Sequence, residues 1–231
     1  GLSFSTSQTL ILEKLEQVLR PGEKTVANKF QDFFASLSTV SQDPSDIAAR
    51  HIAVDAGRGV VASIKSVANG IKDLRELVSD SIKGNLSDFN KTIELLGSVQ
   101  TEILGNAIPN RTPNNLLDQR DAYLKTLSEF ADISVDYLKN NSVRVSLGKT
   151  GQGQALVDGL NFKKLKLQNV DGASKIYIDD GPNSASTIIQ IQSGEIAGYM
   201  AADIALTETK RSLDDLTKSL VAEFNEVHRF G

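Results

Sequence analysis

The spacing of the large apolar residues between residues 44 and 104 constrains the fold more than any other feature of this chain. They recur at alternating steps of three and four, and no proline follows Pro44 within this stretch. This spacing places them on one face of an α-helix and is typical of a coiled-coil seam. Two further steps of four form a stutter, which locally unwinds a supercoil. The seam residues are Val60, Ile64, Val67, Ile71, Leu74, Val78, Ile82, Leu86, Phe89, Ile93 and Leu96.

The pattern predicts one helix over about residues 44–104, roughly 90 Å long at about 1.5 Å per residue. We expect Asp43 to be its N-cap and Pro44 to occupy its first helical position. Glycines inside the stretch weaken the helix, and the close pair Gly57 and Gly59 predicts a kink.

A helix of this length needs partner helices along it. Residues 7–19 and 24–40 both carry apolar residues at helical spacing, and residues 194–227 repeat leucines at steps of three, four or seven. We expect the second and the last of these helices to pack against the long one. The stripe of the second helix consists of Val26, Phe30, Phe33, Phe34 and Leu37.

Between residues 133 and 192 the apolar residues no longer follow helical spacing. Apolar and polar residues alternate over residues 133–137 and 143–147, and Asn140 with Asn141 forms a turn between them, which predicts a β-hairpin. Apolar runs farther along predict more strands, separated by stretches of turn composition. These runs lie at residues 162–167, 176–178 and 188–191.

The elements together predict a mainly α fold with a small β region. We expect an elongated helical bundle or coiled coil around one very long helix, with a small antiparallel β subdomain at one end. The predicted divisions are a helical rod of residues 1–132, a β-rich subdomain of residues 133–192, and a C-terminal helix of residues 193–231 that completes the rod.

The composition excludes several classes of function. The 231 residues carry a formal net charge of −4 without a basic tail, so nucleic-acid binding is not expected. The chain has no cysteine, which excludes disulfides, thiolate metal sites and cysteine nucleophiles. The apolar runs are far shorter than the ~20 residues that cross a bilayer, and no signal-peptide pattern opens the chain. We therefore expect no membrane insertion.

Three motifs suggest ligand binding but lack parts that the chemistry requires. The stretch LGKTGQG at residues 147–153 has Val143 where a phosphate loop needs its first glycine, and no helix is expected after it. The DDG turn at residues 179–181 lacks the spaced oxygen ligands of a calcium loop. His51 and His228 lie far apart and have no further metal ligand at helical spacing apart from ordinary carboxylates. We expect no cofactor and no metal site.

A dense polar cluster lies in NNLLDQRDAYL, residues 114–124. On a helix that begins near Asn114, Arg120 falls on the apolar face, together with Leu117, Leu124, Leu127 and Ala131. A buried guanidinium needs carboxylate or carbonyl partners, so we expect Arg120 to be paired and to tie this helix to the β-hairpin. Asp118 and Asp121 project at other angles and suit the positive N-terminus of the helix.

The same cluster could instead be acid–base machinery. Catalysis requires an acid and a base that converge on one cleft, and no motif in the sequence supplies the second half of such a pair. We therefore interpret Asp43, Pro44, Asp118, Arg120 and Asp121 as structural residues, and we expect no catalytic residue.

Three parts of the sequence resemble the flagellar hook-associated protein 1 family. FQDFFASLSTVSQDPSDIAAR, residues 30–50, is similar to the family's paired-Phe helix, its Asn/Asp-Pro break and its Ala-Ala-Arg helix start. PNNLLDQRDAYLKTLSEFADISV, residues 113–135, is similar to its Pro-Asn-Asp-Leu-Leu-Asp-x-Arg-Asp segment. SGEIAGYM and FNEVHRFG, residues 193–200 and 224–231, resemble its last core helix.

The resemblance implies a structural subunit that joins the hook of the bacterial flagellum to its filament, and not an enzyme. Family members are exported through the flagellar type III apparatus without a cleaved signal peptide, so the expected location is extracellular, in the flagellum. They form a ring of their own copies. The other expected partners are the hook protein, the second junction protein and an export chaperone.

The resemblance further implies that this chain is the central rod-like domain and does not assemble by itself. The family's terminal polymerisation segments and its outer β-rich domain have no recognisable counterpart in the sequence. The alternative interpretation is a coiled-coil adaptor or scaffold of a secretion or envelope assembly. Such adaptors flank a helical hairpin with β-domains on both sides, whereas here the β pattern lies only on the C-terminal side of the long helix.

Overall fold

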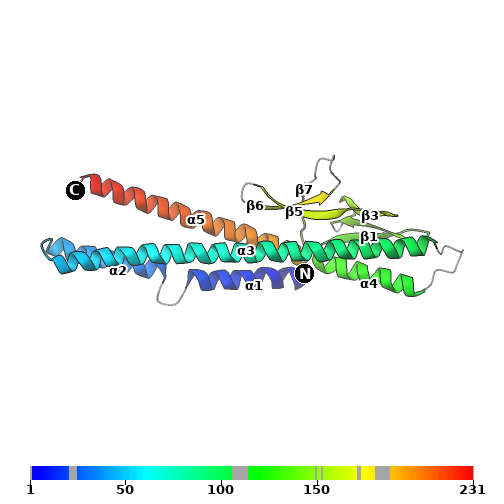
Figure 1. Ribbon diagram of the computed structural model, residues 1–231, viewed down its shortest axis with the longest axis horizontal. Coiled ribbons are helices and arrows are strands. Elements are labelled where there is room, and N and C mark those ends of the chain that lie inside the picture. The colour runs from blue at the N-terminus through cyan, green and yellow to red at the C-terminus, as the bar shows by residue number, and fades with distance from the viewer. Residues whose placement is uncertain are drawn as a thin grey trace. The chain divides into compact units, whose positions relative to one another are not determined.

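The computed structural model describes residues 2–20, 25–105, 114–148, 150–151, 153–170, 173–179 and 188–230, which form five helices and seven strands (Figure 1). The helices are α1 (Leu2–Leu19), α2 (Val26–Gln42), α3 (Ile47–Gly105), α4 (Asn114–Phe130) and α5 (Glu195–Phe230). The strands are β1 (Ile133–Tyr137), β2 (Val143–Leu147), β3 (Ala155–Asp158), β4 (Asn161–Phe162), β5 (Lys164–Val170), β6 (Ala173–Asp179) and β7 (Ile188–Ile189). The predicted mainly α fold with a small antiparallel β component is confirmed.

The long helix predicted from the apolar spacing is α3, which continues without interruption for 59 residues. Every predicted seam residue is buried except Ile64, which is half-buried, and the buried face extends to Val99 and Ile103. The helix also continues through Gly57 and Gly59. A Cβ at Gly57 would lie 3.2 Å from the ring of Phe33 on α2, so this glycine allows a close approach of two helices.

The beginning of α3 differs from the prediction. The helix starts at Ile47, and its N-cap is Asp46 rather than Asp43. The Oδ1 atom of Asp46 accepts hydrogen bonds from the backbone N–H groups of Ala48, at 2.8 Å, and Ala49, at 3.1 Å. Such bonds satisfy N–H groups that have no partner within the helix.

Asp43 closes a turn instead of capping α3. It is the C-cap residue of α2, and its Oδ1 accepts hydrogen bonds from the hydroxyl and the backbone N–H of Ser45, at 2.6 and 3.0 Å. These local bonds compete with a helix start, so Pro44 lies in the turn. They also lower the pKa of Asp43 below its ordinary 3.8. The ionised carboxylate therefore stabilises the turn at pH values above 3.8. This stabilisation is lost as the pH falls through the lowered pKa.

The chain forms two compact units. Unit 1 consists of Gly1–Leu10 and Val78–Asp203, and unit 2 of Ile11–Leu77 and Ile204–Gly231. The helices α1, α3 and α5 each contribute residues to both. The boundary in α3 falls at Val78, within the run of consecutive steps of four from Leu74 to Leu86 in the seam. The division into residues 1–132, 133–192 and 193–231 follows the chain order and stays a prediction.

Unit 2 is an assembly of helices on the first part of α3. The predicted contact with α2 is present at Gly57, and the ring of Phe33 on α2 also packs against the ring of Phe224 on α5, with centroids 5.4 Å apart. Helix α1 approaches α3 closely, because a Cβ at Gly70 would lie 2.6 Å from a methyl group of Val18.

Unit 1 contains the second part of α3, the helix α4 and two antiparallel sheets (Figure 1). The sheets have the strand orders β1-β2-β3-β4 and β5-β6-β7. The predicted hairpin is β1–β2, in which Val135 lies opposite Val145. The sequence pattern missed β3, because a strand of 4 residues is too short to show a clear alternation. The single run predicted over residues 162–167 corresponds to the end of β4 and the start of β5.

Gly70 and Gly84 provide a test of the α1–α3 approach. Inside a helix, alanine is more favourable than glycine by about 1 kcal/mol. At Gly84 a Cβ would have no neighbour within 4 Å, so Gly84→Ala is expected to raise the free energy of unfolding by up to about 1 kcal/mol. Gly70→Ala is expected to lower it by about 1 kcal/mol, because the overlap with Val18 outweighs the gain. Thermal unfolding measures both, and an equal stabilisation by the two substitutions would contradict the close approach.

Candidate functional site

The joint between α4 and the β1–β2 hairpin is held by Arg120. Its side chain is almost fully buried, and its Nη1 donates to the backbone carbonyl of Asn141 at 2.7 Å. Its Nε and Nη2 atoms lie 2.9 and 2.8 Å from Oδ1 of Asp121. The guanidinium also lies over the ring of Tyr137, 4.9 Å from its centroid. One side chain therefore connects a helix to both the strand β1 and the hairpin turn.

The hairpin turn presents the carbonyl that Arg120 binds. Asn141 has a φ of 63°, a left-handed conformation that asparagine tolerates better than most residues. Oδ1 of Asn140 accepts from the hydroxyl of Ser142 at 2.7 Å and from its backbone N–H at 3.2 Å. These bonds fix the turn locally.

The structure corrects the expected positions of the two aspartates. Helix α4 begins at Asn114 and carries no acidic residue in its first turn, so Asp118 and Asp121 both lie beyond the part where the helix dipole acts. Asp121 is the partner of Arg120 instead. Asp118 is exposed, and the most buried apolar residue at the start of α4 is Leu116 rather than Leu117. The preceding loop, PNRTP, lies outside the described residues.

A second polar connection, which sequence reasoning missed, is made by Gln100 on α3. Its side chain is fully buried, and its Oε1 accepts from the backbone N–H of Val143 at 2.6 Å. Its Nε2 donates to the carbonyls of Val143, at 2.9 Å, and Gly159, at 3.1 Å. The carboxamide thus binds one residue of β2 through both backbone groups, as a neighbouring strand would. The sequence does hold a signal, since Gln100 continues the seam four residues after Leu96.

Asn90 makes the same kind of connection to the other sheet. Its Nδ2 donates to the carbonyl of Leu165 and its Oδ1 accepts from the N–H of Leu165, both at 2.8 Å. Leu165 lies in β5, an edge strand whose outer backbone groups have no strand partner in the described sheet. One face of α3 therefore holds both sheets. Gly97, between the two amides, allows the ring of Phe162 in β4 to approach, because a Cβ there would lie 3.1 Å from it.

Asp132 joins the end of α4 to the start of α5. Its buried carboxylate accepts from the backbone N–H groups of Gln192, at 2.8 Å, and Ser193, at 3.2 Å. Its backbone carbonyl accepts from Gly148 at 2.9 Å. The residue precedes β1 and fixes the segment that enters α5.

The motifs that suggested ligand binding gain no support in the described residues. No group of three or more histidine or acidic residues that could hold a metal occurs within them. His51 is exposed on α3, and the side chain of His228 lies outside the described part. The glycine-rich stretch leads into β3 rather than a helix. Lys149 of this stretch lies outside the described residues, and so do Asp180 and Gly181 of the DDG turn. None of the described helices carries an apolar stretch long enough to cross a bilayer.

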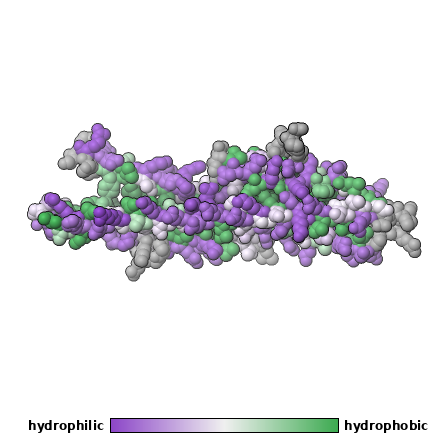
Figure 2. All heavy atoms as spheres, viewed as in Figure 1, coloured by the Kyte–Doolittle hydropathy of each residue, from purple (hydrophilic) through white to green (hydrophobic). Residues whose placement is uncertain are grey.

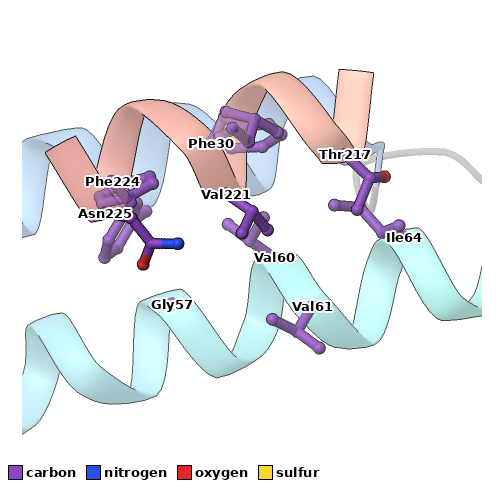
Figure 3. Close-up of a pocket in the computed structure, with 11 residues that line it drawn as sticks. Phe30, Gly57, Val60, Val61, Ile64, Thr217, Val221, Phe224 and Asn225 are labelled. Atoms are coloured by element: carbon purple, nitrogen blue, oxygen red, sulfur yellow. The ribbon is translucent and has the colours of Figure 1, made fainter. Parts of the chain in front are cut away.

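Unit 2 contains an apolar groove of about 300 Å³ between α2, α3 and α5 (Figure 3). Side chains from α3 and α5 point into it from opposite sides. The groove, called the apolar groove below, is lined by Phe30, Phe33, Gly57, Val60, Val61, Ile64, Thr217, Leu220, Val221, Phe224 and Asn225.

These features define a helical scaffold domain in which polar side chains fasten two small sheets to a long helix. The chain belongs to the family described as the flagellar hook-associated protein FlgK helical domain, whose model matches residues 12–231. The family membership predicted from three parts of the sequence is thereby confirmed.

Two curated relatives and one solved structure illustrate the similarity. The chain is 23% identical over 228 residues to flagellar hook-associated protein 1 of Escherichia coli (strain K12), and 26% identical over 245 residues to that of Bacillus subtilis (strain 168). Each alignment covers 95% of this chain, which spans 41% and 48% of the two relatives. The structure of the flagellar hook junction protein FlgK from Burkholderia pseudomallei matches 87% of this chain and 36% of its own, with a TM-score of 0.74 at 23% identity. This match supports the fold.

Arg120→Ala is expected to lower the free energy of unfolding by about 2 kcal/mol, because it removes charge-assisted hydrogen bonds from a buried position. It should also uncouple α4 from the hairpin, so that the amides of β1 and β2 exchange hydrogen faster. Arg58→Ala is the control, since the Arg58–Asp55 ion pair is exposed and is expected to contribute less than about 0.5 kcal/mol. A melting temperature unchanged by Arg120→Ala would contradict this role.

Gln100→Met preserves the length of the side chain but leaves the N–H of Val143 without its partner in a buried site. The carbonyl of Val143 loses its partner as well. Each unpaired buried group costs about 1–3 kcal/mol, so the free energy of unfolding should fall by at least about 2 kcal/mol. Gln119→Met on the exposed face of α4 is the matched control and should change it little. Chemical denaturation measures both, and equal effects would show that the carboxamide does not hold β2.

Proposed function

We propose that this chain is the helical domain of a structural subunit in the junction between the flagellar hook and filament, and that it is not an enzyme. The observation that carries the proposal is the family match over residues 12–231. The relatives are named as hook-associated proteins, and the solved neighbour as a hook junction protein. The chain spans less than half of these relatives, so the role of the whole subunit is part of the proposal.

The geometry of unit 1 supports a structural role. The carboxamides of Gln100 and Asn90 each make two-point hydrogen bonds to strand backbones, and Arg120 links α4 to the hairpin. A sheet held in this way cannot slide along α3 without breaking a donor and an acceptor together. Such fastening is what a domain under mechanical load requires.

The proposed partners follow from the position in the flagellum. Other copies of the subunit in a ring, the hook protein and the second junction protein would contact it, and an export chaperone would accompany it before assembly. The proposed location is extracellular, after export through the flagellar type III apparatus without a cleaved signal peptide. The roles of Asp43, Pro44, Asp118, Arg120 and Asp121 are proposed to be structural.

Deletion of the gene tests the function. Cells that lack the subunit are expected to assemble hooks without attached filaments, to release flagellin into the medium and to lose swimming motility. Electron microscopy of the cell surface and immunodetection of flagellin in the medium measure this outcome. The complete gene should restore filaments, and deletion cells with normal filaments would refute the proposal.

The substitutions described above separate folding from function. Complementation with Arg58→Ala should restore motility as the wild type does, whereas Arg120→Ala should restore it less well because the helix–hairpin joint is loosened. Secreted levels of both variants, measured alongside, show whether any loss comes from export rather than from the junction.

A further inference from the structure

A second cavity lies in unit 1 and, unlike the apolar groove of unit 2, has a largely polar lining. Its volume is about 490 Å³, and it is formed by the stretch between β2 and β3 and the segment that leads from β7 into α5. Its polar groups come from Asp132, Thr150, Gln154, Gln190 and Gln192, and it is called the Asp132 cavity below. Figure 2 shows that hydrophilic and hydrophobic residues interleave over the strands of this unit, in contrast to an apolar docking face.

Asp132 has hydrogen-bonding capacity that the described residues leave unused. It is 7% exposed, and both hydrogen bonds to its carboxylate, from the N–H groups of Gln192 and Ser193, reach Oδ1. Within the described residues, Oδ2 receives no hydrogen bond and no lysine, arginine or histidine pairs with the carboxylate. A carboxylate offers about four acceptor positions, and burying its charge without a cation is costly. The carboxylate therefore favours a cationic donor in the cavity.

The other polar groups of the lining are neutral and can accept hydrogen bonds. The side chains of Gln154, Gln190 and Gln192 are exposed, and no group in the described part of the chain binds their carboxamides. Among the described lining residues, Asp132 alone is charged. One carboxylate surrounded by neutral acceptors favours a cation with several N–H donors.

A guanidinium group matches these acceptors better than a metal ion or an ammonium group. Ca²⁺ takes about 6–8 oxygen ligands, commonly from several carboxylates, and the described residues contain no group of three or more histidine or acidic residues. The N–H donors of a guanidinium spread in one plane, so they reach a carboxylate and neighbouring amide oxygens together. A guanidinium is also more weakly hydrated than an ammonium, so it enters a partly enclosed cavity at lower cost. Arg120 shows the same combination in this chain, since it binds a carboxylate and a carbonyl.

We propose that the Asp132 cavity binds a guanidinium group, and that this group belongs to an arginine side chain of another polypeptide chain. Leu147 and Ile189 also line the cavity and provide apolar surface for the methylene stem of such a side chain. Arginine is enriched at protein interfaces, where it combines this stem with a charged fork. The proposal does not rest on the role at the junction, because it uses only the contacts of the described residues.

Titration with N-acetyl-L-arginine amide, followed by NMR of the isotope-labelled 231-residue chain, tests the proposal. The backbone amides of Gln192 and Ser193 are expected to shift saturably, because they donate to the carboxylate that binds the probe. N-acetyl-L-citrulline amide has nearly the same shape without the charge, and it should bind at least about tenfold more weakly. N-acetyl-L-lysine amide should bind at least about threefold more weakly. Absence of saturable shifts at these amides, or equal binding of the arginine probe and either control probe, would overturn the proposal.

Two variants of the lining test which groups bind the probe. Asp132→Asn removes the charge but retains an oxygen for the N–H groups of Gln192 and Ser193, and it should weaken binding of the arginine probe at least about tenfold. Gln190→Ala removes an exposed neutral acceptor and should weaken binding about twofold or more. Gln119→Ala, on the exposed face of α4, is the control and should leave the affinity unchanged. Unchanged affinity in Asp132→Asn would contradict the proposal, and if that variant does not fold, unchanged affinity in Gln190→Ala does so.

Further titrations decide where the guanidinium comes from. Free L-arginine should bind about as well as the capped probe, because a site for a protein side chain recognises only the guanidinium and its stem. If free L-arginine binds at least tenfold more tightly, the cavity is a site for a small molecule, and the protein source is overturned. Without any probe, shifts of the Gln192 and Ser193 amides that grow with protein concentration identify a second copy as the supplier of the arginine, and their absence assigns it to a different protein.

Discussion

The pairing of side-chain amides on α3 with strand backbones is the interaction on which the organisation of unit 1 depends. Gln100 and Asn90 each offer a donor and an acceptor to a single strand residue, Val143 or Leu165. Backbone groups on the outer side of an edge strand, or beyond the end of a ladder, have no strand partner, and burying them without another partner is costly. The two amides remove that cost, and they set where along α3 each sheet lies.

Arg120 makes a polar connection of the same kind between α4 and the β1–β2 hairpin. A guanidinium that falls on the packed face of α4 is tolerable only because a turn carbonyl and a carboxylate meet it. The α4–hairpin joint, the two amides and Asp132 are therefore polar connections between elements that apolar packing alone would leave free to slide. Apolar packing is directionless, whereas hydrogen bonds define a position. This combination fits the structural role proposed for the chain.

Among the described residues of unit 2, the contacts between helices include apolar ones at close range. Its helices meet through apolar contacts and close glycine approaches, such as Gly57 to Phe33 and Gly70 to Val18, and they leave a groove open. The two units therefore differ in how their elements are held together. In unit 1 polar bonds hold the strands, whereas in unit 2 several large apolar residues of α3 and α5 remain exposed.

Much of the fold could be predicted because its patterns are local. The period of the apolar residues determined α3, the alternation over residues 133–147 determined the hairpin, and the helical phase of Arg120 placed it on a packed face. Local patterns did not decide which aspartate caps α3, since Asp43 and Asp46 both suit that position and the bonds from Ser45 select between them. Nor did they reveal β3 or the roles of Asn90 and Gln100. The apolar period places Gln100 on the seam of α3, but it does not show which strand residue either amide binds, because a hydrogen bond across 43 or 75 positions leaves no periodic trace in the sequence.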